Sequence, residues 1–394
     1  MNIKTIKSNG SDLTDLSRKL GLRAKMDQQD VIAVVTGIID KVRTDGDEAL
    51  CAYTSRFDKA CLKPEDLRVT EEEIDRAMAV LDPKLILILQ KAKANILEFH
   101  KAQVTPEITM DRGSGASISM LVRPLQTVGV YVPGGTAALP SSVLMNILPA
   151  IAAGVPRIVM CTPPRRDGSV DPMILAAARI AGAGEIYRAG GAQAIAAMAY
   201  GTATVPAVDK ICGPGNIYVN TAKRLVYGVV DIDMFAGPSE ILILADRTAN
   251  ASFLAADLLS QAEHDKLASA ILITDNASLA DQVAQQVIVR AERMPRREIL
   301  EASLADYCAI VTVPNLEVAV EFANILAPEH LELCIANPEA VVPRIHHAGA
   351  IFVGNYSPEP LGDYFAGPSH VLPTSGTARF FSRSTRRIFR RRPV

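Results

Sequence analysis

The sequence contains no tryptophan, and none of its apolar runs is long and uninterrupted enough to cross a membrane. The two long uncharged stretches, residues 125–156 and 190–208, are broken by proline, glycine and polar side chains. The N-terminus, which reads Met-Asn-Ile-Lys-Thr-Ile-Lys-Ser, lacks the apolar core and the small-residue cleavage site of a secretion signal. These absences argue against a membrane partner, and we expect a cytoplasmic protein.

Cysteine pairs are also missing, because the six cysteines are scattered and no Cys-x-x-Cys motif occurs. Most of them stand in apolar, strand-like contexts, which is typical of reduced and buried thiols. None has the histidine, lysine and glycine neighbours that would indicate an activated nucleophile. Catalysis through a cysteine is therefore not indicated.

Acidic residues are absent from the end of the chain, where residues 379–394 hold seven arginines. The net charge of the whole chain is −2, so the remainder has 34 basic and 43 acidic residues and a net charge of about −9. A basic arm that binds nucleic acid normally stands on a basic surface, whereas this one follows an acidic body. We expect no nucleic-acid partner and regard residues 379–394 as an atypical basic tail.

What is present points to an α/β protein with more than one domain. The chain has 394 residues, which is too long for one compact core. Hydrophobic residues make up 49% of the chain, and its mean hydropathy is +0.18. This composition, rich in alanine, valine and isoleucine, is typical of helices packed on a parallel sheet.

The order of the predicted elements supports this class. Helical periodicity starts near Asp27 and dominates the first hundred residues, and strand and helix patterns alternate after residue 117. Strands separated by helices of this length predict parallel sheets covered on both faces. We expect one doubly wound domain at residues 127–236 and a second series of strands and helices from Ile241 onward. Ligands bind such domains at the carboxyl ends of the strands.

Three of the predicted strands end in glycine-rich turns. Glycine lets backbone N–H groups approach a phosphate, and the helix that follows presents its positive end. No segment is the Gly-x-Gly-x-x-Gly fingerprint, since the closest one starts at Gly182 and has Tyr187 where the third glycine should be. Tight turns in an α/β domain explain these glycines equally well, so a dinucleotide site of unusual type stays open. The turns lie at residues 128–135, 189–193 and 212–216.

The stretch Asp231–His264 contains the candidate for a metal site. It predicts a buried strand at Ile241–Ala245 and a helix from about Thr248 whose last turn holds Gln261 and His264. Residues three apart on a helix share a face, so the amide oxygen of Gln261 and the imidazole of His264 can converge on one point. They could begin a zinc site. A helix cap and a hydrogen-bonded histidine are the alternative that local sequence favours.

Two later stretches supply ionisable groups. A proline ends a predicted helix, so Glu329 and His330 are expected on a loop at its mouth. A carboxylate beside an imidazole can act as an acid/base pair near neutral pH, although solvated loop residues are the alternative. Asp363, in a turn rich in glycine and proline, could add an oxygen ligand to Gln261 and His264 or could simply shape the turn.

Four segments taken together resemble histidinol dehydrogenase, and the resemblance extends over nearly the whole chain to about Arg379. The block that runs from Ala-Gly-Pro-Ser-Glu to Ser-Gln-Ala-Glu-His is long and highly specific. The four segments are residues 231–264, 328–330, 362–363 and 367–370.

The resemblance implies a zinc-containing, NAD-dependent homodimer that oxidises L-histidinol through L-histidinaldehyde to L-histidine in histidine biosynthesis. It also implies two incomplete Rossmann-like, doubly wound domains in tandem. The implied boundaries are 1–22 for a small N-terminal segment, 23–126 plus 237–378 for a discontinuous first α/β domain with the metal and acid/base residues, and 127–236 for a second domain that binds NAD.

The resemblance also carries site residues over to this chain. Glu329 and His330 resemble the acid/base pair, with His330 accepting protons in both oxidations and Glu329 activating the water that hydrates the aldehyde. The implied zinc ligands are Gln261, His264 and Asp363. The implied NAD contacts are Tyr131, Gln193 and Asn216. The implied substrate contacts are Ser239 and His370, together with Gln261, His264, His330 and Asp363.

The end of the chain departs from the family that it resembles. That family continues past Thr-Ser-Gly-Thr-Ala-Arg with a small C-terminal domain, whose glutamate and histidine reach into the partner's site. No histidine or glutamate follows His370 here, so we expect that domain to be missing. Two alternatives stay open. One is a catalytically impaired, truncated form that acts only as a dimerisation or binding partner. The other is a related NAD-dependent dehydrogenase of another small polar alcohol.

Overall fold

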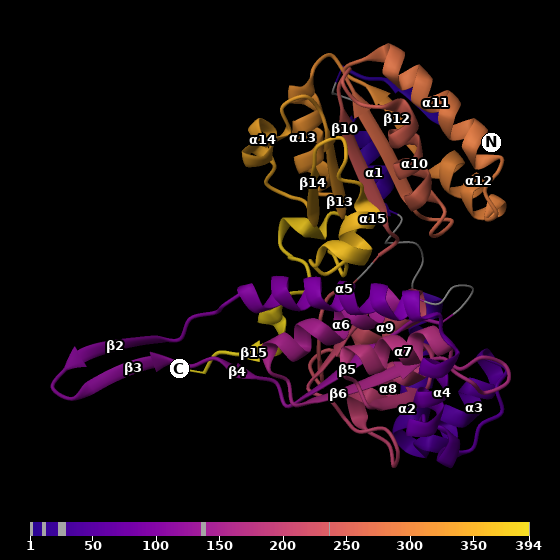
Figure 1. The fold of residues 1–394 in the computed structure, drawn as a ribbon, viewed down its shortest axis with the longest axis vertical. Helices are drawn as coiled ribbons and strands as arrows, with labels where there is room; N and C mark the ends of the chain where they lie inside the picture. The colour runs from indigo at the N-terminus through magenta and orange to yellow at the C-terminus, as the bar shows by residue number, and fades with distance from the viewer. Residues whose placement is uncertain (1–2, 10–12, 23–28, 135–138, 236, 394) are drawn as a thin grey trace. The chain divides into compact units, whose positions relative to one another are not determined.

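The computed structural model describes residues 3–9, 13–22, 29–134, 139–235 and 237–393. The chain forms two compact units, and each is built around a parallel β-sheet (Figure 1). This is the mixed α/β architecture with parallel sheets that the alternation of strands and helices predicts. The first unit comprises residues 1–27, 236–362 and 372–383, and the second comprises 28–235, 363–371 and 384–394.

The first unit contains a six-stranded sheet with the order β1-β12-β11-β10-β13-β14. All neighbouring strands are parallel. Its central strands are runs of fully buried residues, as expected where helices cover both faces. The strands are β1 (Lys4–Lys7), β10 (Glu240–Ala245), β11 (Ser269–Thr274), β12 (Ala309–Thr312), β13 (His330–Cys334) and β14 (Ala350–Val353).

Helices pack on both faces of this sheet (Figure 1). Alternate side chains of β10 point to opposite faces. Ile241 and Ile243 pack with α10, α11 and α12, whereas Leu242 and Leu244 pack with α1 and α13. The helices are α1 (Leu13–Leu22), α10 (Ala251–Ala262), α11 (Ala277–Ala291), α12 (Arg297–Asp306), α13 (Leu316–Leu326), α14 (Pro338–Val341) and α15 (Glu359–Leu361).

The second unit contains a five-stranded parallel sheet with the order β7-β6-β5-β8-β9. One face packs on α4, α5, α6 and α7, and the other packs on α2, α3, α8 and α9. The strands are β5 (Thr127–Tyr131), β6 (Arg157–Thr162), β7 (Glu185–Arg188), β8 (Lys210–Cys212) and β9 (Asp231–Ile232). The helices are α2 (Gln29–Asp45), α3 (Asp47–Phe57), α4 (Glu71–Val80), α5 (Pro83–Ala102), α6 (Pro140–Ala153), α7 (Pro172–Ala181), α8 (Gly191–Tyr200) and α9 (Ile217–Val226).

The early helices belong to a different unit from the domain expected for them, which joined residues 23–126 to 237–378. The apolar stripe of α2, represented by Val35 and Val42, lies in the same buried cluster as α8 and α9. The stripe of α5 lies in the cluster of α6 and α7. Periodicity locates such a stripe but does not reveal which sheet it covers. The start of the first helix expected near Asp27 lies outside the described residues.

The N-terminal segment, expected as a small appendage, contributes a strand that the sequence pattern did not predict. β1 pairs in parallel with β12, in the register Lys4 to Ala309, and so forms one edge of the six-stranded sheet. Its side chains are mostly exposed and two of the four are lysines, as is common for an edge strand. For that reason the segment lacks the alternation of apolar and polar residues that predicts a strand.

Most of the arginine-rich tail packs within the second unit, to which residues 384–394 belong, whereas residues 379–383 belong to the first unit. Residues Arg386–Phe389 form a short 3-10 helix, and β15 (Arg390–Arg391) pairs antiparallel with β4 (Arg123–Pro124). Phe389 is 1% exposed and belongs to the buried cluster of α4 to α7. A second antiparallel pair, β2 (Ile108–Gly113) with β3 (Ala116–Met120), forms a hairpin. None of the described helices has the length and apolar character needed to span a bilayer.

Candidate active site

Glu329 and His330 lie where a helix gives way to a buried strand. Helix α13 ends at Leu326, Ala327 adopts a left-handed conformation with φ of 51°, and a proline follows. His330 is the first residue of β13, and it pairs with Ile241 of β10. Both ionisable side chains are buried, with exposures of 6% for Glu329 and 2% for His330. The solvated-loop alternative is therefore wrong, because the β13 ladder draws His330 into the sheet.

The main chain of Glu240 contacts both of these side chains. Its N–H donates to Oε2 of Glu329 at 2.9 Å, and its carbonyl oxygen lies 3.1 Å from Nδ1 of His330. A carbonyl oxygen only accepts, so Nδ1 carries the proton and Nε2 carries the lone pair of the neutral ring. This orientation leaves Nε2 as the nitrogen of His330 that could accept a proton. Oε2 of Glu329 also lies 3.7 Å from Nδ1 of His330.

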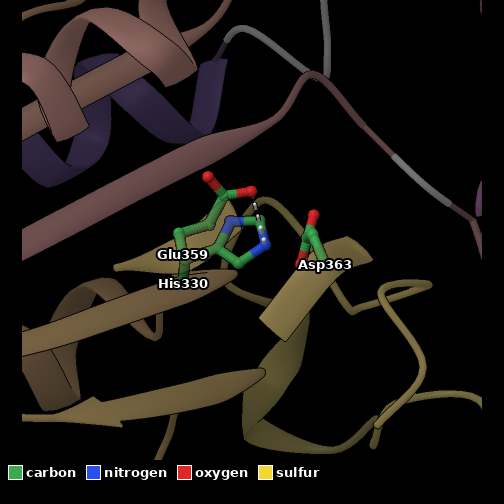
Figure 2. A group of neighbouring side chains, drawn as sticks. All are labelled: His330, Glu359 and Asp363. Carbon is green, nitrogen blue, oxygen red and sulfur yellow. Dashed lines mark ion pairs between the residues drawn. The ribbon is translucent and has the colours of Figure 1, made fainter. Parts of the chain in front are cut away.

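Two further carboxylates lie next to the imidazole of His330 (Figure 2). Oε1 of Glu359, from α15, is 3.9 Å from Nε2 of His330. Asp363 directly follows Gly362 and lies in the π-helical turn Gly362–Ala366. One ligand atom from each of the three residues lies within 4.8 Å of the others, so this buried group could hold a metal ion.

Gln261 and His264 meet at the end of α10, as their spacing predicts. Nε2 of Gln261 lies 3.2 Å from Nδ1 of His264. Gln261 is fully buried, and its Oε1 has no hydrogen-bond partner among the described residues. A buried amide oxygen in that condition is a suitable ligand atom for a metal ion. The buried group of His330, Glu359 and Asp363 shares Asp363 with the ligand set expected from the sequence, and His264 is not part of it.

An acidic pair that no sequence pattern had indicated lies next to His330. Glu332 stands two residues along β13 on the same face, is 1% exposed, and its Oε1 accepts from the N–H of Glu359 at 2.7 Å. Its carboxyl interacts with Asp257, which lies one turn before Gln261 on α10. Burial, reinforced by Asp257, raises the pKa of Glu332 to about 8, and burial raises the pKa of Asp257 to about 6. The alternation His-x-Glu along a buried strand was the signal that could have found it.

The two expected substrate residues are partly buried. Ser239 directly precedes β10, and its carbonyl oxygen accepts from the N–H of Ser269 at 3.1 Å. Nδ1 of His370 lies 4.0 Å from Oδ2 of Asp363. The structure therefore brings His370 close to Asp363 and places Ser239 at the start of the strand that orients His330.

The expected NAD residues lie at the carboxyl ends of strands in the five-stranded sheet. The hydroxyl oxygen of Tyr131, at the end of β5, accepts from the N–H of Gly191 at 3.1 Å. Gln193, in the first turn of α8, is 1% exposed, and neither atom of its amide has a hydrogen-bond partner among the described residues. Asn216 caps α9, because its Oδ1 accepts from two backbone N–H groups. Gly135, at the end of the first glycine-rich turn, lies outside the described residues.

Comparison with known proteins identifies close relatives. The model of the family described as histidinol dehydrogenase matches residues 22–393. The histidinol dehydrogenase of Bacillus subtilis is 52% identical over 382 residues, which cover 97% of this chain and 88% of that protein. The crystal structure of histidinol dehydrogenase from Elizabethkingia anophelis superposes with a TM-score of 0.94 at 39% identity, and the match covers 99% of this chain and 89% of that one. An apo betaine aldehyde dehydrogenase from Staphylococcus aureus, with a TM-score of 0.50 and 13% identity, is alike in fold alone.

These matches give no support to the expectation that a C-terminal domain is missing. The chain covers 88% and 89% of the two histidinol dehydrogenases. The family model itself runs to residue 393, and so includes the arginine-rich tail. The absence of histidine and glutamate after His370 had suggested a lost domain. It describes only which residue types occur in that segment.

Proposed function

The chain belongs to the histidinol dehydrogenase family, and on that premise we propose how its residues divide the work of the reaction. The enzyme is an NAD-dependent oxidoreductase that uses zinc and converts L-histidinol through L-histidinaldehyde to L-histidine. Each oxidation passes one hydride to NAD and releases one proton, and the second requires water to add to the aldehyde.

The observation that carries the proposal is the orientation of His330. Its Nδ1 donates to the carbonyl oxygen of Glu240, which leaves Nε2 as the basic nitrogen. We assign to Nε2 the proton released from the hydroxyl group in each oxidation. Glu329, held by the N–H of the same residue, is assigned the proton of the water that hydrates the aldehyde.

Gln261, His264 and Asp363 are proposed to hold the zinc ion. The unsatisfied, buried Oε1 of Gln261 and its contact with His264 support this set. When bound, zinc acts as a Lewis acid and template for the polar groups of the substrate. Ser239 and His370 are proposed to contact the substrate, because His370 lies near Asp363 and Ser239 precedes Glu240, whose main chain binds Glu329.

Tyr131, Gln193 and Asn216 are proposed to contact NAD. The buried Gln193 amide, which lacks partners among the described residues, supports a ligand at the start of α8. The two parallel sheets with helices on both faces are compatible with two incomplete Rossmann-like domains. A homodimer is proposed from the family, and the cytoplasmic location expected from the sequence stays a prediction.

The assignment is tested with purified enzyme, zinc, NAD and L-histidinol, measuring reduced NAD and the acid product. We expect one NAD reduced for each of the two oxidations. His330→Asn should slow both oxidations by about 10²–10⁴-fold, because a positioned base is lost. Glu329→Gln should slow the oxidation of supplied histidinaldehyde more than that of histidinol, since water is activated only in the second half.

His346→Asn serves as the matched control, because His346 is an exposed histidine outside the site and its loss should leave both rates unchanged. An equal loss in both halves for Glu329→Gln would refute the division of labour. No turnover of histidinol by the zinc-loaded wild type would refute the function itself.

A further inference from the structure

Asp58 lies against the glycine turn that begins α8, although 132 residues separate it from that turn in the sequence. It follows the last residue of α3 and acts as the C-terminal cap of that helix. A Cβ atom added to Gly190 would lie 3.4 Å from Oδ1 of Asp58 and 2.6 Å from Cβ of Pro163. The carboxylate, the proline and the turn therefore form one cluster at the carboxyl ends of β6 and β7.

The carboxylate of Asp58 is only partly satisfied. Its Oδ2 is buried and has no hydrogen-bond partner among the described residues. Burial raises the pKa of this carboxyl to about 6, so most molecules carry its negative charge at neutral pH. A carboxylate can only accept hydrogen bonds, so a donor that reached Oδ2 would stabilise it.

An independent observation marks the same turn as a ligand site. Gln193, in the first turn of α8, is 1% exposed, and both its Oε1 and its Nε2 lack partners among the described residues. Its Oε1 would lie 2.8 Å from a Cβ added to Gly191, so the amide lies over the turn. The ten-residue helix α8 presents its positive end there, which favours a phosphate.

A nucleotide-binding sheet of this kind usually discriminates NAD from NADP with an acidic residue after its second strand, which accepts from the ribose hydroxyls. Here the second strand, β6, is followed by Pro163 and Pro164, and neither can accept through a side chain. Arg165, next in the chain, is paired with Asp171. Asp58 stands beside Pro163, and so supplies a carboxylate where the strand itself has none.

We propose that Asp58 is the residue that selects NAD over NADP, by accepting hydrogen bonds from the ribose diol and repelling a 2′-phosphate. This inference rests on the proposed NAD site. The phosphates of the cofactor avoid the carboxylate and bind the helix end, whereas the sugar hydroxyls are the donors that suit it. A second phosphate on the ribose would place two anions together in a partly buried site, which is costly.

The test compares wild type with Asp58→Asn, which keeps the shape of the side chain and removes its charge. Glu65→Gln is the matched control, because Glu65 is an exposed acid seven residues away. For each protein, kcat and KM are measured with NAD and with NADP at saturating histidinol. Dissociation constants of NADH and NADPH are measured by calorimetry, so that binding is read without turnover.

We expect the ratio of kcat/KM for NAD to that for NADP to fall about tenfold or more in Asp58→Asn, and to stay unchanged in Glu65→Gln. The change should lie in KM and in the dissociation constants, with kcat for NAD preserved. An unchanged NADH to NADPH affinity ratio in Asp58→Asn would overturn the inference. If Asp58→Asn fails to fold, Asp58→Ser takes its place. If the wild type binds NADH but does not oxidise histidinol, the proposed function is refuted. The NADH and NADPH dissociation constants of Asp58→Asn would then still test the role of Asp58.

Discussion

At the scale of single residues, the main chain of Glu240 determines how the proposed acid/base pair is held. Its N–H and its carbonyl oxygen bind Glu329 and His330 respectively. β10, which carries Glu240, is paired on both sides, by β11 and by β13. The side chain of Glu240 has a separate contact, because its Oε1 accepts from the N–H of Ser375 at 2.9 Å. The orientation of the pair is therefore a property of the sheet backbone.

The acidic pair behind the site makes the stability of the enzyme depend on pH. The ordinary pKa of a glutamate is 4.5, and burial with Asp257 nearby raises that of Glu332 to about 8. Between these values the folded chain holds more protons at Glu332 than the unfolded chain, so the free energy of unfolding falls as pH rises. Glu332→Gln removes this titration and keeps an oxygen that accepts from the N–H of Glu359. We expect the melting temperature of the variant, relative to wild type, to rise from about pH 5 to about pH 8.

Thermal unfolding across that pH range measures the effect, and Glu301→Gln, an exposed acid in the same unit, is the control. A difference between Glu332→Gln and wild type that stays constant with pH would show that Glu332 does not titrate as its burial implies.

Site residues that are close together in the chain could be predicted from the sequence. Site residues that only folding brings together could not. Helical spacing predicted that Gln261 and His264 meet, and their side chains are 3.2 Å apart. Their role as metal ligands stays a prediction. Glu359 reaches His330 from 29 residues away, through the return of the chain after β14. No local pattern encodes that approach, because it depends on two elements packing on one sheet.

At the scale of elements, the periodic signals were reliable where burial is uniform. The expected strand Ile241–Ala245 is observed as β10, and the helix expected from about Thr248 is observed as α10, which begins at Ala251. The edge strand β1 was not predicted, because its side chains are mostly exposed and hydrogen bonding to β12 alone defines it.

The folded tail offers a test at this scale. Phe389 is 1% exposed and packs in the cluster that joins α5, α6 and α7, so Phe389→Ala removes a large buried ring and leaves a cavity. We expect the free energy of unfolding to fall by about 3–5 kcal/mol. Denaturant titration measures it, with Phe380→Ala as the control, because Phe380 is 73% exposed. A loss in Phe389→Ala no larger than in the control would mean that the tail does not pack in solution.

At the scale of the whole molecule, the β2–β3 hairpin supports the proposed homodimer. Its cross-strand pairs Ile108 with Met120 and Met110 with Ile118 line one face, while Thr109 and Ser119 lie on the other. Ile108, Met110 and Ile118 are each more than 40% exposed. In Figure 1 the hairpin projects away from the five-stranded sheet of its own unit. A second copy of the chain is the occupant that family membership favours for this apolar face.

Sedimentation equilibrium tests this placement. We expect wild type to sediment as a dimer and Ile118→Asp to raise the dimer dissociation constant by tenfold or more, since a charge is buried at a contact. Thr109→Asp, on the polar face of the same hairpin, should leave the dimer intact. A monomeric wild type would contradict the homodimer. An unchanged dimer dissociation constant in Ile118→Asp would show that the hairpin is not the dimer interface.

The sequence by itself determined the class of fold, the family and the short-range pairs. Alternating buried strands and amphipathic helices specify parallel sheets covered on both faces, because each element must bury its apolar side. The block around Gln261 and His264 carries the resemblance to the family whose model matches residues 22–393, and helical spacing brings those two side chains together.

Only the tertiary structure decided which sheet the early helices cover, how His330 is oriented, and which carboxylates surround it. These depend on contacts between segments far apart in the chain, such as Glu240 with His330 and Asp58 with the turn at Gly190. A stripe on a helix or an acid in a loop is compatible with many partners. The packing of the complete core selects one of them, because burial and hydrogen bonding must be satisfied everywhere at once.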